Sequence, residues 1–139
     1  MRYAALTWMM IQYDQWTDSL EAARRFVAGA SKGYLSRKLK NGRGYWYLQY
    51  REGSRILSQY VGTDDEKKVK ETATLIEKRR EEERYIRRME RELHVLRKAI
   101  RAIIARIAKR ISRRKDRTMS EYEKHILTRW SRHATERAA

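Results

Sequence analysis

Basic and aromatic side chains alternate through residues 33–61, and they are the side chains of this chain best suited to binding a polyanion. Lysine and arginine pair with phosphates, arginine and glutamine pair with guanine and adenine edges, and tyrosine rings stack on unpaired bases. Residues 31–62 hold seven basic residues against one acidic residue. The residues predicted to bind nucleic acid here are Tyr34, Lys38, Lys40, Arg43, Tyr45, Tyr47, Gln49 and Arg51.

A second group of cations lies towards the C-terminus, where residues 105–139 hold eleven basic and four acidic residues. Cations near the end of a helix complement its dipole, but this group is denser than that effect requires. Each cation that neutralises a phosphate makes binding more sensitive to salt. The predicted phosphate ligands are Arg110, Arg113, Arg114, Lys115 and Arg117, preceded by Arg106 and Lys109.

Three short strands joined by two tight turns are predicted to position the first group. Asn41-Gly42 is a strong hairpin signal, because a type I′ turn needs positive φ at both central residues. Glu52-Gly53 is the expected second turn. These two turns place Lys38 opposite Tyr45, Ser36 opposite Tyr47, Leu35 opposite Leu48, Leu48 opposite Leu57 and Tyr47 opposite Ser58.

This register sorts the strands into two faces, since side chains alternate across a strand. The apolar face is predicted to carry Leu35, Leu39, Trp46, Leu48, Leu57 and Val61. The other face combines rings, hydroxyls, an amide and cations without an acidic residue: Tyr34, Ser36, Lys38, Lys40, Tyr45, Tyr47, Gln49, Arg51, Ser58 and Tyr60. A sheet of this kind followed by a helix can enter the major groove of DNA, whereas tyrosine platforms favour single-stranded RNA or DNA.

Residues 1–30 are apolar and carry no net charge, and their spacing predicts two helices. Asp18 with Glu21 is expected to start the second helix, which runs from Leu20 to Ala28 and ends at Gly29. These helices are expected to cover the apolar face of the sheet or to meet a partner subunit. The alternative is a helix lying on a membrane surface.

A long helix is predicted over residues 63–116, because Thr63 and Glu66 form a capping box and no glycine or proline follows Gly62. A heptad-like stripe runs along it, which is typical of a coiled coil. We expect a homodimer through this stripe, made of Ile86, Met89, Leu93, Leu96, Ile100, Ile103 and Ile107. The alternative cover is the chain's own segment 117–139, where Ser120 and Glu123 cap a helix whose apolar face holds Met119, Tyr122, Ile126, Trp130 and His133.

Catalytic and metal-binding patterns are missing from the sequence. There is no cysteine, no Gly-rich phosphate loop and no His-Glu-x-x-His motif. The apolar run 3–13 is shorter than the roughly 20 residues that cross a bilayer. We therefore expect no enzyme activity, no cofactor, no metal and no membrane partner, and a cytoplasmic, nucleoid-associated protein. The net charge of +16 points to nucleic acid as partner.

The run from Tyr45 to Gly62, with the acidic cap and Lys/Glu-rich helix after it, resembles a small uncharacterised domain of bacteria and archaea, often in mobile-element or plasmid settings. The pattern also resembles, more loosely, the arm-type DNA-binding domains of tyrosine recombinases. The resemblance covers residues 33–80 and implies no established activity. Residues 1–30 and the C-terminal helix lie outside it.

The sequence therefore predicts an α+β protein with four segments: N-terminal helices (1–30), a three-stranded antiparallel β-meander (31–62), a long coiled-coil helix (63–116) and a basic amphipathic helix (117–139). The predicted function is double-stranded DNA binding by a homodimer, sequence-specific or architectural, in an accessory or regulatory role such as transcription regulation. One alternative is binding of RNA or single-stranded nucleic acid. The other is a coiled-coil structural subunit of a nucleoprotein or membrane-associated assembly.

Overall fold

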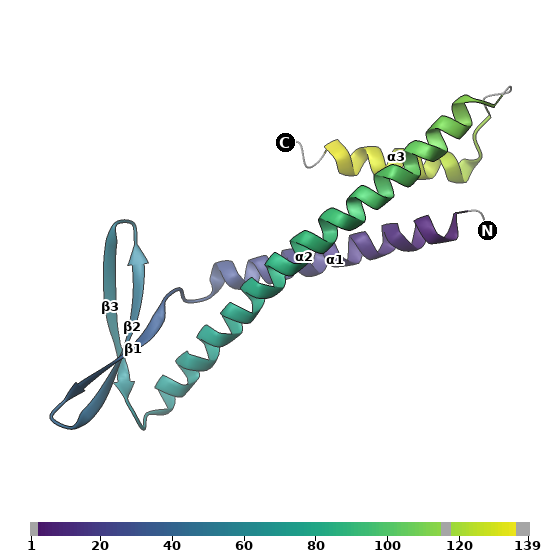
Figure 1. Cartoon of the computed structure of the whole chain (residues 1–139). Helices are drawn as coiled ribbons and strands as arrows, with labels where there is room; N and C mark the ends of the chain where they lie inside the picture. Colours follow the sequence, from purple (N-terminus) through teal and green to yellow (C-terminus); the bar gives the residue numbers. More distant parts are fainter. Residues whose placement is uncertain (1–2, 115–117, 136–139) are drawn as a thin grey trace. The chain divides into compact units, whose positions relative to one another are not determined.

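The computed structural model describes residues 3–114 and 118–135, with side chains up to residue 132. The elements in chain order are α1 (Ala4–Gly29), β1 (Tyr34–Lys40), β2 (Arg43–Glu52), β3 (Arg55–Thr63), α2 (Lys67–Ser112) and α3 (Glu121–Thr135), as Figure 1 shows. The predicted α+β class, the three-stranded β-meander and the long helix are confirmed.

The first hairpin has the predicted register. Lys38 lies opposite Tyr45, Ser36 opposite Tyr47 and Leu35 opposite Leu48. Both turn residues have positive φ, 51° at Asn41 and 74° at Gly42, which is the conformation that a type I′ turn requires.

The second hairpin corrects the predicted register by two residues. Glu52 pairs with Arg55, so the turn residues are Gly53 and Ser54, and Leu48 faces Gln59 instead of Leu57. Only Gly53 has positive φ, and a glycine at the first central position is typical of a type II′ turn. Because the side-chain period is two, a slip of two residues leaves the faces unchanged.

The apolar face of the sheet packs against the start of α2. The buried cluster joins Leu48 and Val61 of the sheet to Val69 and Ile76 of α2, with Leu35, Trp46 and Tyr50 packed around it. The N-terminal helices were predicted to cover this face; in this cluster it is α2 that covers it. Leu39 is also misplaced in the predicted core, since it is 69% exposed near the Asn41-Gly42 turn.

Residues 4–29 form one helix, α1, instead of the two predicted. No glycine or proline lies between Ala4 and Ala28 to interrupt it, and Asp18 sits inside the helix without starting a new one. The buried side chains recur at helical spacing: Leu6, Met10, Tyr13, Leu20 and Ala23.

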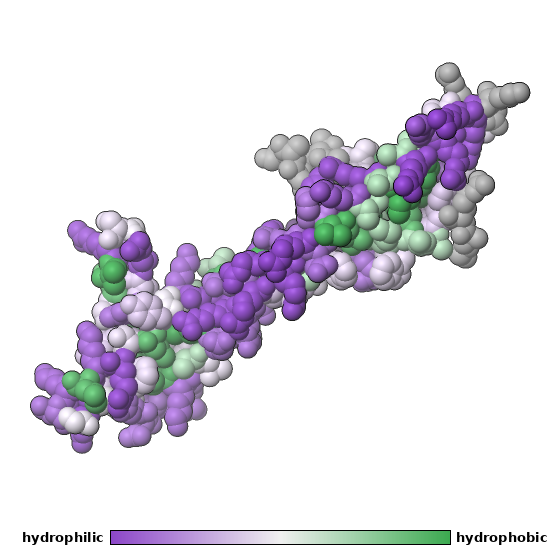
Figure 2. Space-filling view, viewed as in Figure 1, coloured by the Kyte–Doolittle hydropathy of each residue, from purple (hydrophilic) through white to green (hydrophobic). Residues whose placement is uncertain are grey.

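The chain divides into two compact units, residues 1–15 with 92–139 and residues 16–91, and each is described by itself. In the unit of residues 16–91, the second half of α1 contacts α2. Arg24 pairs with Glu90 at 2.6 Å, and the Lys78 ammonium lies 5.0 Å from the centre of the Phe26 ring. Much of the visible surface of α2 is hydrophilic (Figure 2).

The other unit is helical, and in it α3 packs on the start of α1. The rings of Tyr13 and Trp130 meet edge to face at 5.5 Å, those of Tyr3 and Tyr122 stack at 5.7 Å, and Asp14 pairs with Arg129. Ile126 and Trp130 are buried as predicted, Met119 and Tyr122 are exposed, and the side chain of His133 lies outside the described residues.

The predicted dimer stripe on α2 is largely covered within the single chain. Met89, Leu93, Ile100 and Ile107 are buried, and Ile86, Leu96 and Ile103 are half-buried. A homodimer through residues 86–107 would have to form on these half-buried residues or replace the chain's own helices. The homodimer stays a prediction.

Of the predicted capping boxes at Thr63–Glu66 and Ser120–Glu123, the second has the full reciprocal geometry. The Ser120 hydroxyl accepts from the Glu123 N–H at 3.2 Å, and a Glu123 carboxylate oxygen accepts from the Ser120 N–H at 3.0 Å. At the first, the Thr63 N–H and hydroxyl both donate to Glu66 at 3.2 Å, and α2 begins at Lys67.

Glu123 is only 2% exposed, and its carboxylate has further partners besides the helix cap. Arg114 donates to both its oxygens at 2.9 and 3.0 Å, and the Tyr3 hydroxyl donates at 2.8 Å. The hydrogen bonds from Arg114, then those from the Ser120 backbone and Tyr3, lower the pKa of Glu123 from 4.5 to about 2. The carboxylate therefore holds the loop before α3, the start of α3 and the start of α1 together.

This lowered pKa predicts a pH-dependent stability difference between the wild type and Glu123→Gln. A carboxyl whose pKa is lower when folded stabilises the protein fully above its unfolded pKa, and loses that effect as pH falls through the folded value. We expect the wild type to melt well above Glu123→Gln at pH 6 and the gap to close between pH 4.5 and about 2. Thermal melts followed by circular dichroism measure it.

Glu121→Gln is the matched control, because this side chain is 90% exposed and pairs with the exposed Lys124. Its melting temperature should stay close to wild type at every pH. A Glu123→Gln gap that does not change with pH would contradict the assigned network.

Candidate nucleic-acid interface

The face of the sheet opposite the α2 helix carries the residues predicted to bind nucleic acid. The register places Tyr34, Lys38, Lys40, Arg43, Tyr45, Tyr47, Gln49 and Arg51 on this face, together with Ser36, Ser58 and Tyr60. We call these residues the platform. Within the three strands the one acidic residue, Glu52, pairs with Arg55 and alternates onto the other face.

Cations of the platform are open to solvent. Lys38, Lys40, Arg43 and Arg51 are all exposed. Exposed cations on one face of a sheet are free to neutralise phosphates along a backbone. The sheet thus brings together every residue that the sequence predicted for this site.

Three tyrosines of the platform contact one another. The Tyr60 ring lies 5.6 Å from Tyr47, edge to face, and 6.4 Å from Tyr45, and the Lys38 ammonium lies 4.8 Å from the centre of the Tyr47 ring. Partial burial, followed by the Glu66 carboxylate and the other two rings, raises the pKa of Tyr60 above 10. Tyr60 is therefore neutral at pH 7, and these contacts already cover part of the ring surface of the three tyrosines.

Ile56 was not among the residues predicted for this face, but it lies opposite Arg51 on the platform face and is exposed. Its alternation with Ser58 and Tyr60 was the available signal. The platform therefore has an apolar residue at one end, next to Arg51.

Arg37 is a basic residue of the sheet that does not belong to the platform. Its guanidinium donates to both oxygens of Asp64 at 2.7 and 2.6 Å, and the Trp46 indole donates to the same carboxylate at 2.7 Å. The hydrogen bonds from Arg37 and then Trp46 lower the pKa of Asp64 to about 2. Asp64 thus ties two strands to the turn before α2, although the predicted helix 63–116 included this position.

The basic end of α2 belongs to the helical unit and forms a separate candidate surface. Arg106, Lys109, Arg110 and Arg113 are exposed. Arg114 pairs with Glu123 at 2.9 Å and is only partly exposed, so its charge is already matched by a carboxylate. Lys115 and Arg117 lie outside the described residues.

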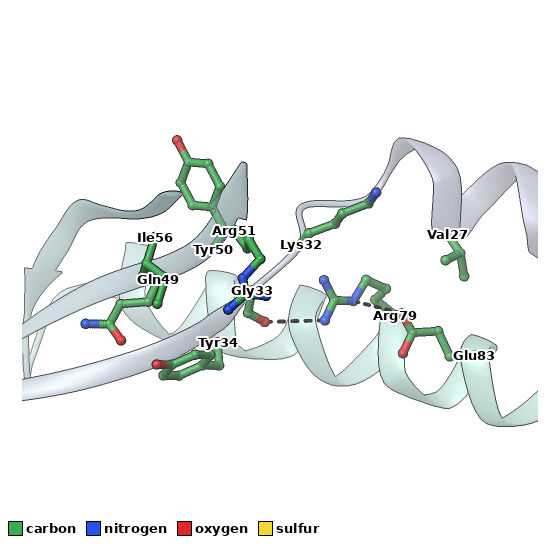
Figure 3. Close-up of a pocket in the computed structure, with 10 residues that line it drawn as sticks. All are labelled: Val27, Lys32, Gly33, Tyr34, Gln49, Tyr50, Arg51, Ile56, Arg79 and Glu83. Carbon is green, nitrogen blue, oxygen red and sulfur yellow. Dashed lines mark hydrogen bonds and ion pairs between the residues drawn. The ribbon is translucent and has the colours of Figure 1, made fainter. Parts of the chain in front are cut away.

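A cavity of about 470 Å³ adjoins the platform where the linker from α1 enters the sheet (Figure 3). Its lining residues are Val27, Lys32, Gly33, Tyr34, Gln49, Tyr50, Arg51, Ile56, Arg79 and Glu83. Tyr34, Gln49, Arg51 and Ile56 also belong to the platform face. Sequence reasoning missed this cavity, because no local pattern connects the linker to α2.

Arg79 of α2 fixes the linker that borders this cavity. It is only 9% exposed, and its terminal nitrogens donate to the carbonyls of Ser31 at 2.8 Å and Gly33 at 3.3 Å. Its Nε is buried without a hydrogen bond, and a Glu83 carboxylate oxygen lies 3.4 Å away. Figure 3 shows the guanidinium between the linker and Glu83.

Gly33 has to be glycine, because its φ is 118° and a Cβ there would overlap the Gln49 carbonyl and lie 3.0 Å from the Tyr50 Cβ. We expect Gly33→Ala to destabilise the protein by about 2 kcal/mol, in the range for residues held in unfavourable backbone regions. Urea unfolding measures the change.

Gly29→Ala is the control, since a Cβ at Gly29 would meet nothing within 4 Å. It should leave the midpoint unchanged or raise it slightly, because alanine favours a helix over glycine. Equal losses at the two positions would show that the close approach at Gly33 does not matter for stability.

Comparison with known proteins gives one similarity. Residues 12–71 match the model of a domain of unknown function, DUF6788. The match runs from α1 through the whole sheet into α2, and so includes the platform but not Arg79 or the basic end of α2. No curated protein and no solved structure matches the chain.

None of the described helices combines the length and apolar character needed to span a bilayer. In the described part of the chain, no three histidine, aspartate or glutamate side chains gather as metal ligands would.

Proposed function

We propose that this protein binds nucleic acid through the platform, with double-stranded DNA as the preferred form, in an accessory, architectural or regulatory role in the cytoplasm. The observation that carries the proposal is the pairing register. It sets four exposed cations, Gln49 and the tyrosines on the one sheet face that α2 does not cover. A cationic strand surface backed by a helix suits the major groove.

The tyrosine contacts favour duplex over single-stranded nucleic acid. Bases stack on open ring faces, but Tyr47 already meets Lys38 and the edge of the Tyr60 ring. Stacking there would require these groups to separate. Duplex binding requires no such change, because the cations contact phosphates and Gln49 can reach a base edge.

Fluorescence anisotropy of labelled duplex DNA and of single-stranded RNA of equal length, at several salt concentrations, tests the proposal. If Lys38, Lys40, Arg43 and Arg51 each neutralise one phosphate, the log-log slope of affinity against salt should be about −3 to −4 for duplex DNA. Tighter binding of the single strand would favour the RNA alternative. Absence of binding to both at low salt would contradict nucleic-acid binding.

A homodimer forms a separate part of the proposal. Sedimentation equilibrium should then give twice the chain mass of 16.8 kDa. A single-chain mass across the concentration range would contradict the dimer but would not affect the proposal that the platform binds nucleic acid.

The second candidate function, an interaction subunit, has one observation in its favour. Trp8 and Ile11 lie three residues apart on α1 and are both exposed, as on a helix face that meets a partner. A monomer that binds neither form of nucleic acid would favour this function.

A further inference from the structure

The cavity beside the platform is lined by both cations and apolar groups. Groove binding by the platform does not require such a cavity. Three cations line it, Lys32, Arg51 and Arg79, against one carboxylate, Glu83. Glu83 lies close to Arg79, which leaves Lys32 and Arg51, both exposed, as the charges available at the mouth. Two such cations are suited to a phosphate group.

Rings and aliphatic groups make up the rest of the wall. Tyr34 is 52% exposed, and Ile56 is also exposed, while Tyr50 and Val27 are half-buried. Unlike Tyr47, Tyr34 has no ring or cation contact among the aromatic contacts found within the described residues. An open tyrosine ring offers a stacking surface for a base.

Polar groups also line the cavity. The amide of Gln49 is one of them. The Arg79 guanidinium is held by two backbone carbonyls and by Glu83, whose carboxylate lies 3.4 Å from the Arg79 Nε, so this part of the wall is fixed before a ligand arrives. Ligand sites of this kind are largely apolar with a few convergent polar groups and fall in the range of roughly 300–1,000 Å³.

We propose that this cavity binds one nucleotide whose base is unpaired, with the base against Tyr34 and the phosphate at the cationic mouth to which Lys32 and Arg51 contribute. The proposal rests on the proposed function in one respect: Tyr34, Gln49 and Arg51 also belong to the platform, so a strand bound there reaches the cavity. The same chemistry is offered by a free mononucleotide and by a bulged nucleotide in a duplex.

The test compares a fully paired duplex, the same duplex with one bulged nucleotide, and free AMP, GMP, CMP and UMP, each titrated against the full chain. The bulged duplex should bind about tenfold tighter than the paired duplex, the effect of one base stacked on a ring. Lys32→Glu removes a mouth charge, and Val27→Phe fills the cavity without changing charge. Lys70→Glu on exposed α2 surface is the control for charge alone.

Both cavity variants should abolish the tenfold preference, while Lys70→Glu should keep it. Competition by millimolar free nucleotides that is lost in the same variants would support the cavity as a site for free nucleotides. Equal binding of the two duplexes without competition by free nucleotides would contradict the cavity as a nucleotide site. It would not affect the proposal that the platform binds nucleic acid. A preference that survives Lys32→Glu and Val27→Phe would also overturn it. Free-nucleotide binding without duplex binding would support the cavity and contradict the proposed function.

Discussion

Replacing Lys38 and Arg43 together by glutamate is expected to lower the affinity for duplex DNA by about 100-fold or more. Both side chains are exposed on the platform, and each reversal removes one phosphate contact and adds one repulsion. A hydrogen bond to a charged group contributes about 1.5–3 kcal/mol, and each 1.4 kcal/mol is tenfold in affinity. Anisotropy titration with labelled duplex at fixed salt measures the loss.

The matched control is Lys68→Glu with Lys70→Glu, which makes the same charge change on exposed positions of α2. This helix packs on the other face of the sheet. The control should lose affinity only through the lower net charge. Similar losses in the two double variants, with unchanged circular dichroism, would mean that binding follows total charge and not the platform.

Replacing Ile100 by alanine is expected to destabilise the protein by about 3–4 kcal/mol. Ile100 is fully buried at 0% exposure, and removal of such a side chain costs the transfer free energy of its atoms and leaves a cavity. Val95→Ala on the same helix is the control, since Val95 is 64% exposed and should change stability by less than about 0.5 kcal/mol.

The same variant separates a core within the chain from a dimer interface. If the chain is a monomer, the wild type and Ile100→Ala should each melt at a temperature independent of protein concentration. A dimer would make the melting temperature rise with concentration. Thermal melts over a hundredfold concentration range distinguish the two.

The platform was predictable because its signals are local. Asn41-Gly42 sets the first hairpin by itself, and alternation assigns each residue to a face. The second hairpin was misread because Glu52-Gly53 and Gly53-Ser54 are both plausible turns around the same glycine. The error left the faces intact, since it moved the register by an even number of residues.

Features that depend on distant residues were beyond the sequence. Arg79 and Gly33 are 46 residues apart, and nothing local shows that a guanidinium on α2 binds the linker carbonyls. The heptad stripe likewise predicts an apolar surface on α2 but not what covers it. Helices of the same chain can bury these side chains as well as a second copy could. Asp18 and Glu21 suggested that a new helix starts within residues 4–29. The helix continues through them, with buried residues both before and after this point.

The most direct test of the central claim is an amide NMR titration of the full chain with a short duplex. The account predicts that the largest shift changes fall on β1, β2 and β3 around Lys38, Arg43, Gln49 and Arg51, with smaller changes along α2. Changes confined to Arg106, Lys109, Arg110 and Arg113, with the strands unmoved, would place binding on the basic end of α2 and contradict the platform as the nucleic-acid interface.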